Sequence, residues 1–261
     1  MAKPPRGAVS KSGRLGLPAT VTACLFDLDG VLTETARIHA RAWKTMFDAF
    51  LRQRTAAEGG RFKPFDKVSD YDEYVDGKPR ADGVRAFLAS RHIKIPEGGD
   101  ADPPGKDTIH GLGNRKDRLF IDLIHRDGVK PYVGSVRYLH AAREAGLRTA
   151  VVSSSRNCSE VLKAAKLDDL FDGQVDGKVA HAEHLKGKPA PDTYLRAARM
   201  LGVRAAGAAV YEDALAGVEA GRAGGFGLVV GVDRTGQAAA LRAHGADVVV
   251  SDLDDLMRVP R

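Results

Sequence analysis

Four groups of polar side chains lie at the predicted carboxyl ends of strands or in the loop beyond them. Together they supply two pairs of carboxylates, one hydroxyl and one ammonium group, which form a complete set for phosphoryl transfer. Carboxylates bind divalent cations, and hydroxyl and ammonium groups bind phosphoryl oxygens, so these residue types suit metal-assisted transfer. The groups are Asp27 with Asp29, Ser153, Lys188, and Glu212 with Asp213.

Each group taken alone has a simpler explanation. The tetrapeptide Asp27-Leu28-Asp29-Gly30 is also typical of turns and helix caps. A serine after a strand commonly caps a helix, and a lysine before a proline is commonly solvated. Only their combination favours catalytic chemistry over local structure.

The elements that must position these groups are strands of a parallel sheet. In an open parallel sheet, functional residues collect beyond the carboxyl ends of the strands. Apolar stretches predict strands at 21–26, 147–152, 208–211, 227–232 and 247–250, and a short extended segment opening at Phe171. Helical spacing predicts helices at 134–145, 159–165, 192–201 and 214–221. This alternation predicts an α/β fold with a parallel sheet covered on both faces.

A purely helical stretch interrupts this alternation after the first strand. Helices are predicted at 35–51, 83–90 and 115–125, with no convincing strand between them. We therefore expect residues 36–126 to form an inserted helical domain, and 21–35 plus 127–261 to form the α/β core. Residues 1–20 are expected to be a flexible basic tail.

Composition narrows the class of protein. With 43% hydrophobic residues the chain can bury a substantial core, and it contains no apolar run that would span a membrane or serve as a secretory signal. Of the net charge of +6, the acid-free tail supplies +4, which leaves +2 for the rest. Cys24 and Cys158 form no CxxC pair. We expect a cytoplasmic monomer that binds neither nucleic acid nor membrane.

The segments FDLDGVL, VVSSS, KGKPAPD and YEDALAGVEAG resemble the four ordered motifs of the haloacid dehalogenase-like superfamily. The resemblance implies a Rossmann-like core with an inserted α-helical cap domain over a Mg²⁺-dependent active site. It implies that Asp27 is the nucleophile that forms an aspartyl-phosphate, and that Asp29 is the general acid/base. Haloacid dehalogenases typically lack an acid at the position of Asp29, so its presence favours a phosphate substrate.

The same resemblance assigns the remaining groups of the core. Ser153 and Lys188 are expected to hold the phosphoryl oxygens. The expected metal ligands are Asp27, the backbone carbonyl of Asp29, Glu212 and Asp213.

Within this superfamily, the segment DLDGVLTETARIHARAWK resembles the β-phosphoglucomutase subfamily. This implies catalytic roles beside Asp29 for Thr35 and His39. It also implies a sugar-phosphate substrate, with β-D-glucose 1-phosphate and D-glucose 6-phosphate interconverted through a 1,6-bisphosphate. The substrate contacts implied by the subfamily or by position are Arg80, Lys116, Ser154, Ser155 and Asn157, and Ser154 stands where alanine was expected.

Several alternatives remain open at this level. A phosphatase would use the same nucleophile, and a catalytically silent binding protein would keep the fold. His39 can be a helix-face histidine packed against Trp43, and Arg80 and Lys116 can be solvated charges. The stretch 96–113 is longer than a compact cap requires. The spacing of His181 and His184 is typical of metal sites, but we predict solvated histidines in a loop.

Overall fold

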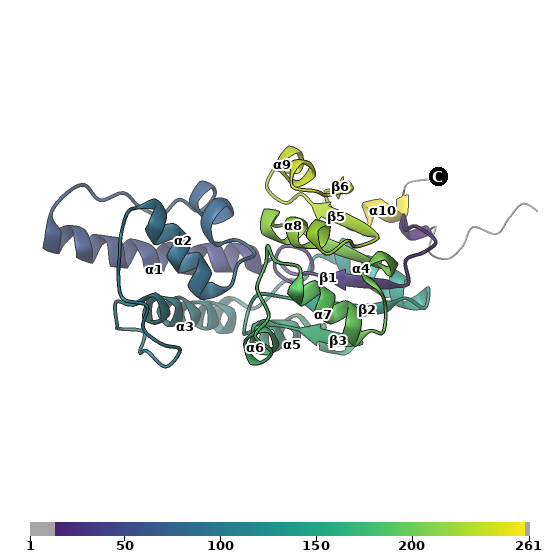
Figure 1. Cartoon of the computed structure of the whole chain (residues 1–261), viewed down its shortest axis with the longest axis horizontal. Helices are drawn as coiled ribbons and strands as arrows, with labels where there is room; N and C mark the ends of the chain where they lie inside the picture. The colour runs from purple at the N-terminus through teal and green to yellow at the C-terminus, as the bar shows by residue number, and fades with distance from the viewer. Residues whose placement is uncertain (1–13, 259–261) are drawn as a thin grey trace, which may run out of the picture.

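The computed structural model describes residues 14–258, which form a parallel sheet and a separate helical part (Figure 1). The sheet has six strands in the order β3-β2-β1-β4-β5-β6, and every adjacent pair is parallel. This arrangement confirms the predicted α/β class. The strands are β1 (Ala23–Phe26), β2 (Arg148–Val152), β3 (Gly173–Val175), β4 (Ala208–Glu212), β5 (Leu228–Val232) and β6 (Val248–Val250).

Helices cover both faces of the sheet, so that successive side chains of each buried strand enter two different apolar cores. In β1, Cys24 and Phe26 face one core, and Ala23 and Leu25 face the other. The first core is completed by α4 (Val133–Glu144), α5 (Cys158–Ala165) and α10 (Asp255–Arg258). The second is completed by α7 (Asp192–Met200), α8 (Leu215–Ala223) and α9 (Ala238–Ala243).

The helical part is inserted between β1 and α4 and has an apolar core of its own. Aromatic rings dominate this core, with Phe47 packed between Trp43 and Phe87. Its helices are α1 (Thr35–Glu58), the π-helix η2 (Tyr71–Val75), α2 (Arg80–Ser90) and α3 (Ile109–Asp127). An inserted helical cap is therefore confirmed, while the domain bounds 36–126 remain a prediction.

Some elements differ from the sequence-based expectation. Helix α1 extends to Glu58, beyond the predicted end at residue 51. Neither α1 nor any other helix within residues 14–258 combines the length and apolar character of a membrane span.

Residues 177–182 form α6 (Gly177–Ala182), because the Asp176 side chain accepts hydrogen bonds from two backbone N–H groups of its first turn. His181 thus lies on a short helix and not in a loop. Short 3₁₀ helices are η3 (Asp168–Leu170) and η4 (Ala205–Gly207).

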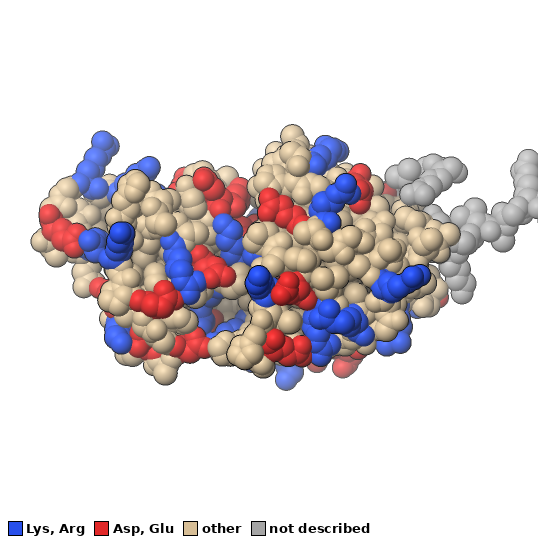
Figure 2. Space-filling model, in the orientation of Figure 1, with Lys and Arg blue, Asp and Glu red and all other residues tan. Residues whose placement is uncertain are grey.

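The predicted flexible tail of residues 1–20 is wrong for its described part. Leu15 and Leu17 are each only 2% exposed and belong to the core under β1. Three of the four basic residues of the tail, Lys3, Arg6 and Lys11, lie outside the described residues. On the face drawn in Figure 2, basic and acidic side chains are interspersed over both parts of the molecule.

A buried hydrogen-bond chain attaches this N-terminal segment to the sheet. Tyr138 on α4 donates to the carbonyl oxygen of Leu15 at 2.9 Å, and its hydroxyl lies 2.8 Å from that of Tyr211 on β4. Cys24 Sγ lies 3.4 Å from the Tyr211 hydroxyl. The phenol of Tyr138 therefore satisfies two polar groups that are removed from water.

Replacement of Tyr138 by phenylalanine should lower the free energy of unfolding by about 2 kcal/mol, because it leaves a buried carbonyl and a buried hydroxyl without this partner. Urea unfolding followed by circular dichroism measures the change. Tyr132→Phe is the matched control, since the Tyr132 ring contacts Arg234 through its face, and we expect a loss below about 0.5 kcal/mol. Equal losses in the two variants would contradict the proposed anchoring.

Candidate active site

Three of the four predicted polar groups meet because their strands are neighbours. Strand β1 lies between β2 and β4, with Phe26 opposite both Val151 and Tyr211. The carboxyl ends of parallel strands share one edge of a sheet, so Asp27, Ser153 and the pair Glu212-Asp213 emerge side by side. The backbone N–H of Asp27 donates to the carbonyl oxygen of Tyr211 at 2.9 Å, which fixes the start of this loop.

The fourth group, Lys188, enters the same edge from the loop before α7. Its ammonium group donates to Asp27 Oδ1, to Glu212 Oε1 and to the carbonyl oxygen of Val152 at 3.3 Å. Burial disfavours the charged ammonium, but the attraction of the two carboxylates outweighs it and raises the pKa of Lys188. Lys188 therefore remains a cation at the centre of the site.

The carboxylates at this edge carry more negative charge than Lys188 neutralises. Burial raises the pKa of Asp27 and of Asp213 well above the usual value, and Glu212 and Asp29 raise both further through repulsion. One oxygen from each of Asp27, Glu212 and Asp213 lies within 4.8 Å of the others. A crowded set of oxygen donors with excess negative charge fits a hard divalent cation. Glu212 is also held by Tyr194, whose hydroxyl donates to Oε1 at 2.9 Å.

Two glycines allow the carboxylates to approach the backbone. Gly30 has φ of +87°, and a Cβ there would lie 1.7 Å from Asp213 Oδ2. A Cβ at Gly217, on α8, would lie 1.8 Å from Glu212 Oε1. Any side chain at the glycine of DLDG or of EDALAG would therefore overlap a carboxylate, and replacing either glycine would displace an acid of the site.

Asp29 is held from the side of the helical cap. Thr35 and His39, both on α1, contact its Oδ1, the first through a hydrogen bond and the second with Nε2 at 3.3 Å. Lys116 on α3 lies 2.5 Å from His39 Nδ1. When Lys116 is protonated it can only donate, so Nδ1 then accepts and the proton of a neutral His39 lies on Nε2, facing Asp29. His39 also stacks on Phe120 at 3.8 Å.

These contacts change the acidity of all three groups. Burial acts to raise the pKa of Asp29, but His39, Thr35 and Lys116 together lower it. Burial lowers the pKa of Lys116 to about 7. Burial and the nearby Lys116 ammonium lower the pKa of His39. Asp29 is thus the ionised member of a buried relay that links the core to two cap helices.

The cap touches the core through the loop that precedes α2. Ser154 Oγ donates to the carbonyl oxygen of Gly77 at 2.7 Å, so this hydroxyl is engaged by the cap. A Cβ at Gly187 would lie 2.1 Å from the ring of Pro79. The cap loop therefore packs directly against the backbone of Gly187, the residue before Lys188. A cavity of about 800 Å³ remains between cap and core.

Most of the side chains predicted from the sequence line this cavity. Thr35 and Asn157 do not line it. Thr35 donates a hydrogen bond to Asp29, and Asn157 donates one to Asp117 at 2.8 Å. The predicted residues that line the cavity are Asp27, Asp29, His39, Arg80, Lys116, Ser153, Ser154, Ser155, Lys188, Glu212 and Asp213.

Sequence reasoning missed several polar residues of the cavity. Arg156 stands between the predicted contacts Ser155 and Asn157, and its basic side chain in that run was a usable signal. Asp76 lies beside Gly77, and burial together with nearby acids raises its pKa to about 7. Asp100, from the long stretch 96–113, reaches across to the core, and nothing local predicts this.

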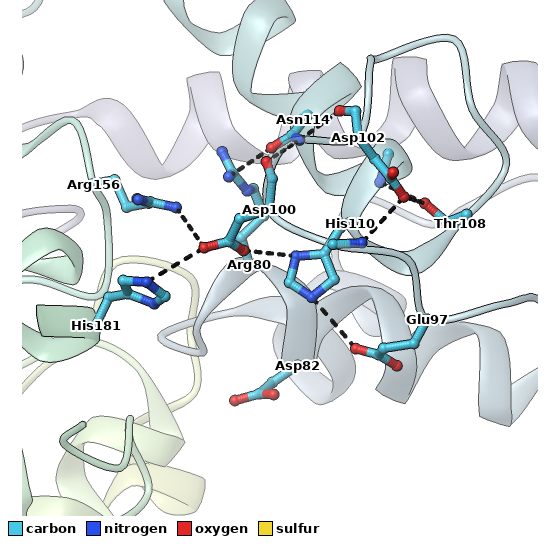
Figure 3. A network of polar contacts seen from close by, with 12 residues as sticks. Arg80, Asp82, Glu97, Asp100, Asp102, Thr108, His110, Asn114, Arg156 and His181 are labelled. Carbon is cyan, nitrogen blue, oxygen red and sulfur yellow. Dashed lines mark hydrogen bonds and ion pairs between the residues drawn. The ribbon is translucent and has the colours of Figure 1, made fainter.

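Figure 3 shows how Asp100 bridges the two parts of the molecule. Its carboxylate lies 3.4 Å from Nε2 of His181 on α6 and 3.6 Å from Nη1 of Arg156, both in the core. On the cap side it lies 2.8 Å from His110 Nδ1. The His181 side chain is 65% exposed, so the predicted solvated histidine is confirmed, although it also lies beside the Asp100 carboxylate.

Comparisons with known proteins agree with this architecture. Residues 21–225 match the family model described as haloacid dehalogenase-like hydrolase. A β-phosphoglucomutase of Mycobacterium bovis is 56% identical over 250 residues, which cover 95% of each chain. A β-phosphoglucomutase of Bacillus subtilis is 32% identical over 90% of this chain and 91% of its own.

A solved structure of a β-phosphoglucomutase from Clostridium difficile superposes with a TM-score of 0.69 at 24% sequence identity, covering 90% of this chain and 93% of that one. At this identity the match supports the fold alone. With a family model that matches most of the chain and a relative that is more than half identical over nearly all of it, this chain belongs to the haloacid dehalogenase-like hydrolase family.

Proposed function

We propose that this chain is a β-phosphoglucomutase that interconverts β-D-glucose 1-phosphate and D-glucose 6-phosphate. The observation that carries the proposal is that the two aspartates have different surroundings. Asp27 lies among Lys188, Glu212 and Asp213 in the core, whereas Asp29 is held by the hinge and cap residues Thr35, His39 and Lys116. The 56% identical mycobacterial relative carries the same functional name.

In the proposed first step, a carboxylate oxygen of Asp27 attacks phosphorus, and the bond from phosphorus to the sugar oxygen breaks. When a sugar hydroxyl attacks the phosphoryl group on Asp27, the ionised carboxylate of Asp29 takes the hydroxyl proton, and in the reverse direction the protonated Asp29 returns that proton to the leaving oxygen. Lys188 and Ser153 hold the phosphoryl oxygens. A Mg²⁺ ion bound by Asp27, Glu212, Asp213 and the Asp29 carbonyl would neutralise the repulsion between nucleophile and phosphate.

A mutase must return the phosphoryl group from Asp27 to a sugar hydroxyl before water intercepts it. The cap supports this protection, because its loop at Gly77 and Pro79 rests on the core and partly covers the cavity. Arg80 and Lys116, both on cap helices, face this cavity and suit the remaining parts of a sugar bisphosphate.

A coupled assay tests this function directly. Purified protein with Mg²⁺, β-glucose 1-phosphate and a trace of β-glucose 1,6-bisphosphate is followed for glucose 6-phosphate and free phosphate together. We expect glucose 6-phosphate to form much faster than free phosphate. Rapid release of phosphate without isomerisation would instead identify a phosphatase, and the absence of both products over a panel of sugar phosphates would identify a silent scaffold.

Asp27→Asn should abolish both isomerisation and phosphate release, because the amide is no nucleophile toward phosphorus. The thermal unfolding midpoint checks that the fold survives. Asp122→Asn, on the exposed face of α3, is the control with the same change of charge and should retain full activity. Turnover of Asp27→Asn near the wild-type rate would rule out the aspartyl-phosphate.

Arg80→Ala should lower kcat/KM for β-glucose 1-phosphate by roughly 30-fold or more, because a charge-assisted contact to the second phosphate of the bisphosphate is lost. Hydrolysis of acetyl phosphate, which has no second phosphate, should change by less than about threefold. The matched control is Arg85→Ala on the same helix, since Arg85 pairs with Asp82 and Glu97 at the surface. Equal damage to both substrates would contradict the role of Arg80.

A further inference from the structure

The carboxylate of Asp117 lies between a cation of the cap and an amide of the core. Its Oδ1 atom is 2.8 Å from Nη1 of Arg80 and accepts a hydrogen bond from Nδ2 of Asn157 at 2.8 Å. Arg80 begins α2, Asp117 lies on α3, and Asn157 precedes α5 of the core. One negatively charged oxygen therefore joins three elements across the cleft.

This arrangement is the one that an oxygen of a bound phosphate would adopt. The Arg80 guanidinium and the Nδ2 amino group of Asn157 both act as donors here, so the Asp117 oxygen serves as the shared acceptor, as a phosphate oxygen can. The second amino group of Arg80 is also engaged, since Nη2 donates to Asn114 Oδ1 at 2.9 Å. In this state both terminal amino groups of Arg80 already have an acceptor.

The pairing lies within reach of a ligand. Arg80 and Asp117 both line the cavity, and their side chains are 22% and 33% exposed. An ion pair that is partly open to solvent is weak enough to exchange partners. Asp117 can therefore turn toward water when a stronger anion takes its place.

The other arginine among the cavity-lining residues is paired in a similar way. Arg156 lies 3.6 Å from Asp100, and Asn114 Nδ2 donates to the backbone carbonyl of Asp100 at 3.0 Å. Figure 3 shows Arg80 bonded to Asn114 and Arg156 beside the Asp100 carboxylate. Both guanidinium groups that line the cavity thus face carboxylates of the cap.

We propose that Asp117 is a specificity-determining residue that occupies an anion site between Arg80 and Asn157 until a ligand displaces it. A phosphate dianion carries more charge than one carboxylate and replaces it, whereas a neutral group or a single carboxylate does not. The site therefore selects ligands with a tetrahedral dianion at this end. The identification of that dianion with the second phosphate of a sugar bisphosphate rests on the proposed function.

Sulfate binding tests the competition without any catalytic step. Sulfate is titrated into the full-length protein in EDTA at constant ionic strength, and the dissociation constant is measured by calorimetry for the wild type, Asp117→Asn and Asp117→Ser. Asp122→Asn, which removes a carboxylate from an exposed position five residues further along α3, is the matched control. A thermal unfolding midpoint is recorded for each variant.

We expect both Asp117 variants to bind sulfate about fivefold more tightly than the wild type, because the internal competitor is gone. Asp122→Asn should bind as the wild type does. The gain should disappear when Arg80→Ala is combined with Asp117→Asn, which places the extra affinity at this arginine.

Unchanged or weaker binding in the Asp117 variants overturns the proposal, as does a gain that persists without Arg80. The absence of sulfate binding in all of the proteins overturns it as well. Because sulfate is not turned over, these results stand apart from the isomerisation assay. A failed mutase assay with tighter sulfate binding would reject the function and keep the anion site.

Discussion

The active site depends on the neutralisation of carboxylates that the sheet brings to one edge. Asp27, Glu212 and Asp213 are buried within 4.8 Å of one another, and Lys188 supplies one positive charge among them. An unpaired buried carboxylate is costly, so this cluster is tolerable only while cations are present. The same imbalance makes the site suitable for a divalent cation and then for a phosphate, whose own charge requires neutralisation.

The second constraint is the contact between cap and core. Asp29 belongs to the core, but His39 and Lys116, which help to lower its pKa, belong to the cap, and Thr35 donates to it from the first residue of α1. A movement of the cap therefore changes both the access of water and the acidity of Asp29. Under the proposed function, proton transfer by Asp29 and closure of the cap are coupled through these contacts, which favours a sugar hydroxyl over water as the acceptor.

The long stretch 96–113 and Asp117 supply further polar contacts between cap and core. Asp100 and Asp117 pair with the two arginines that line the cavity, so the empty cavity is bordered by cations with internal partners. Such pairing keeps the cavity organised without a ligand and sets a threshold of charge for entry. Selectivity then arises from competition between the Asp117 carboxylate and the anion of the ligand for the Arg80 guanidinium, in addition to the shape of the cavity.

The sequence by itself determined the fold class and the inserted helical cap, and it predicted the acids that the sheet gathers at the candidate site. Apolar runs that end in Asp27, Ser153 and Glu212 reveal strand ends locally, and a parallel sheet brings such ends together in any register. The sequence also placed His39 and Lys116 in the site, through the resemblance to a known subfamily. It misjudged the segment from residue 14 to residue 20, because two leucines in a Gly- and Pro-containing stretch give no periodic signal.

Only the tertiary structure decided which charges are paired. Arg80, Asp117 and Asn157 lie in three separate segments, and nothing in the spacing of their neighbours indicates that one carboxylate oxygen serves the other two. The same holds for Asp100 with Arg156 and His181. Secondary structure follows from local periodicity, but contacts between cap and core depend on how two separately packed bodies meet, and that is set by long-range packing.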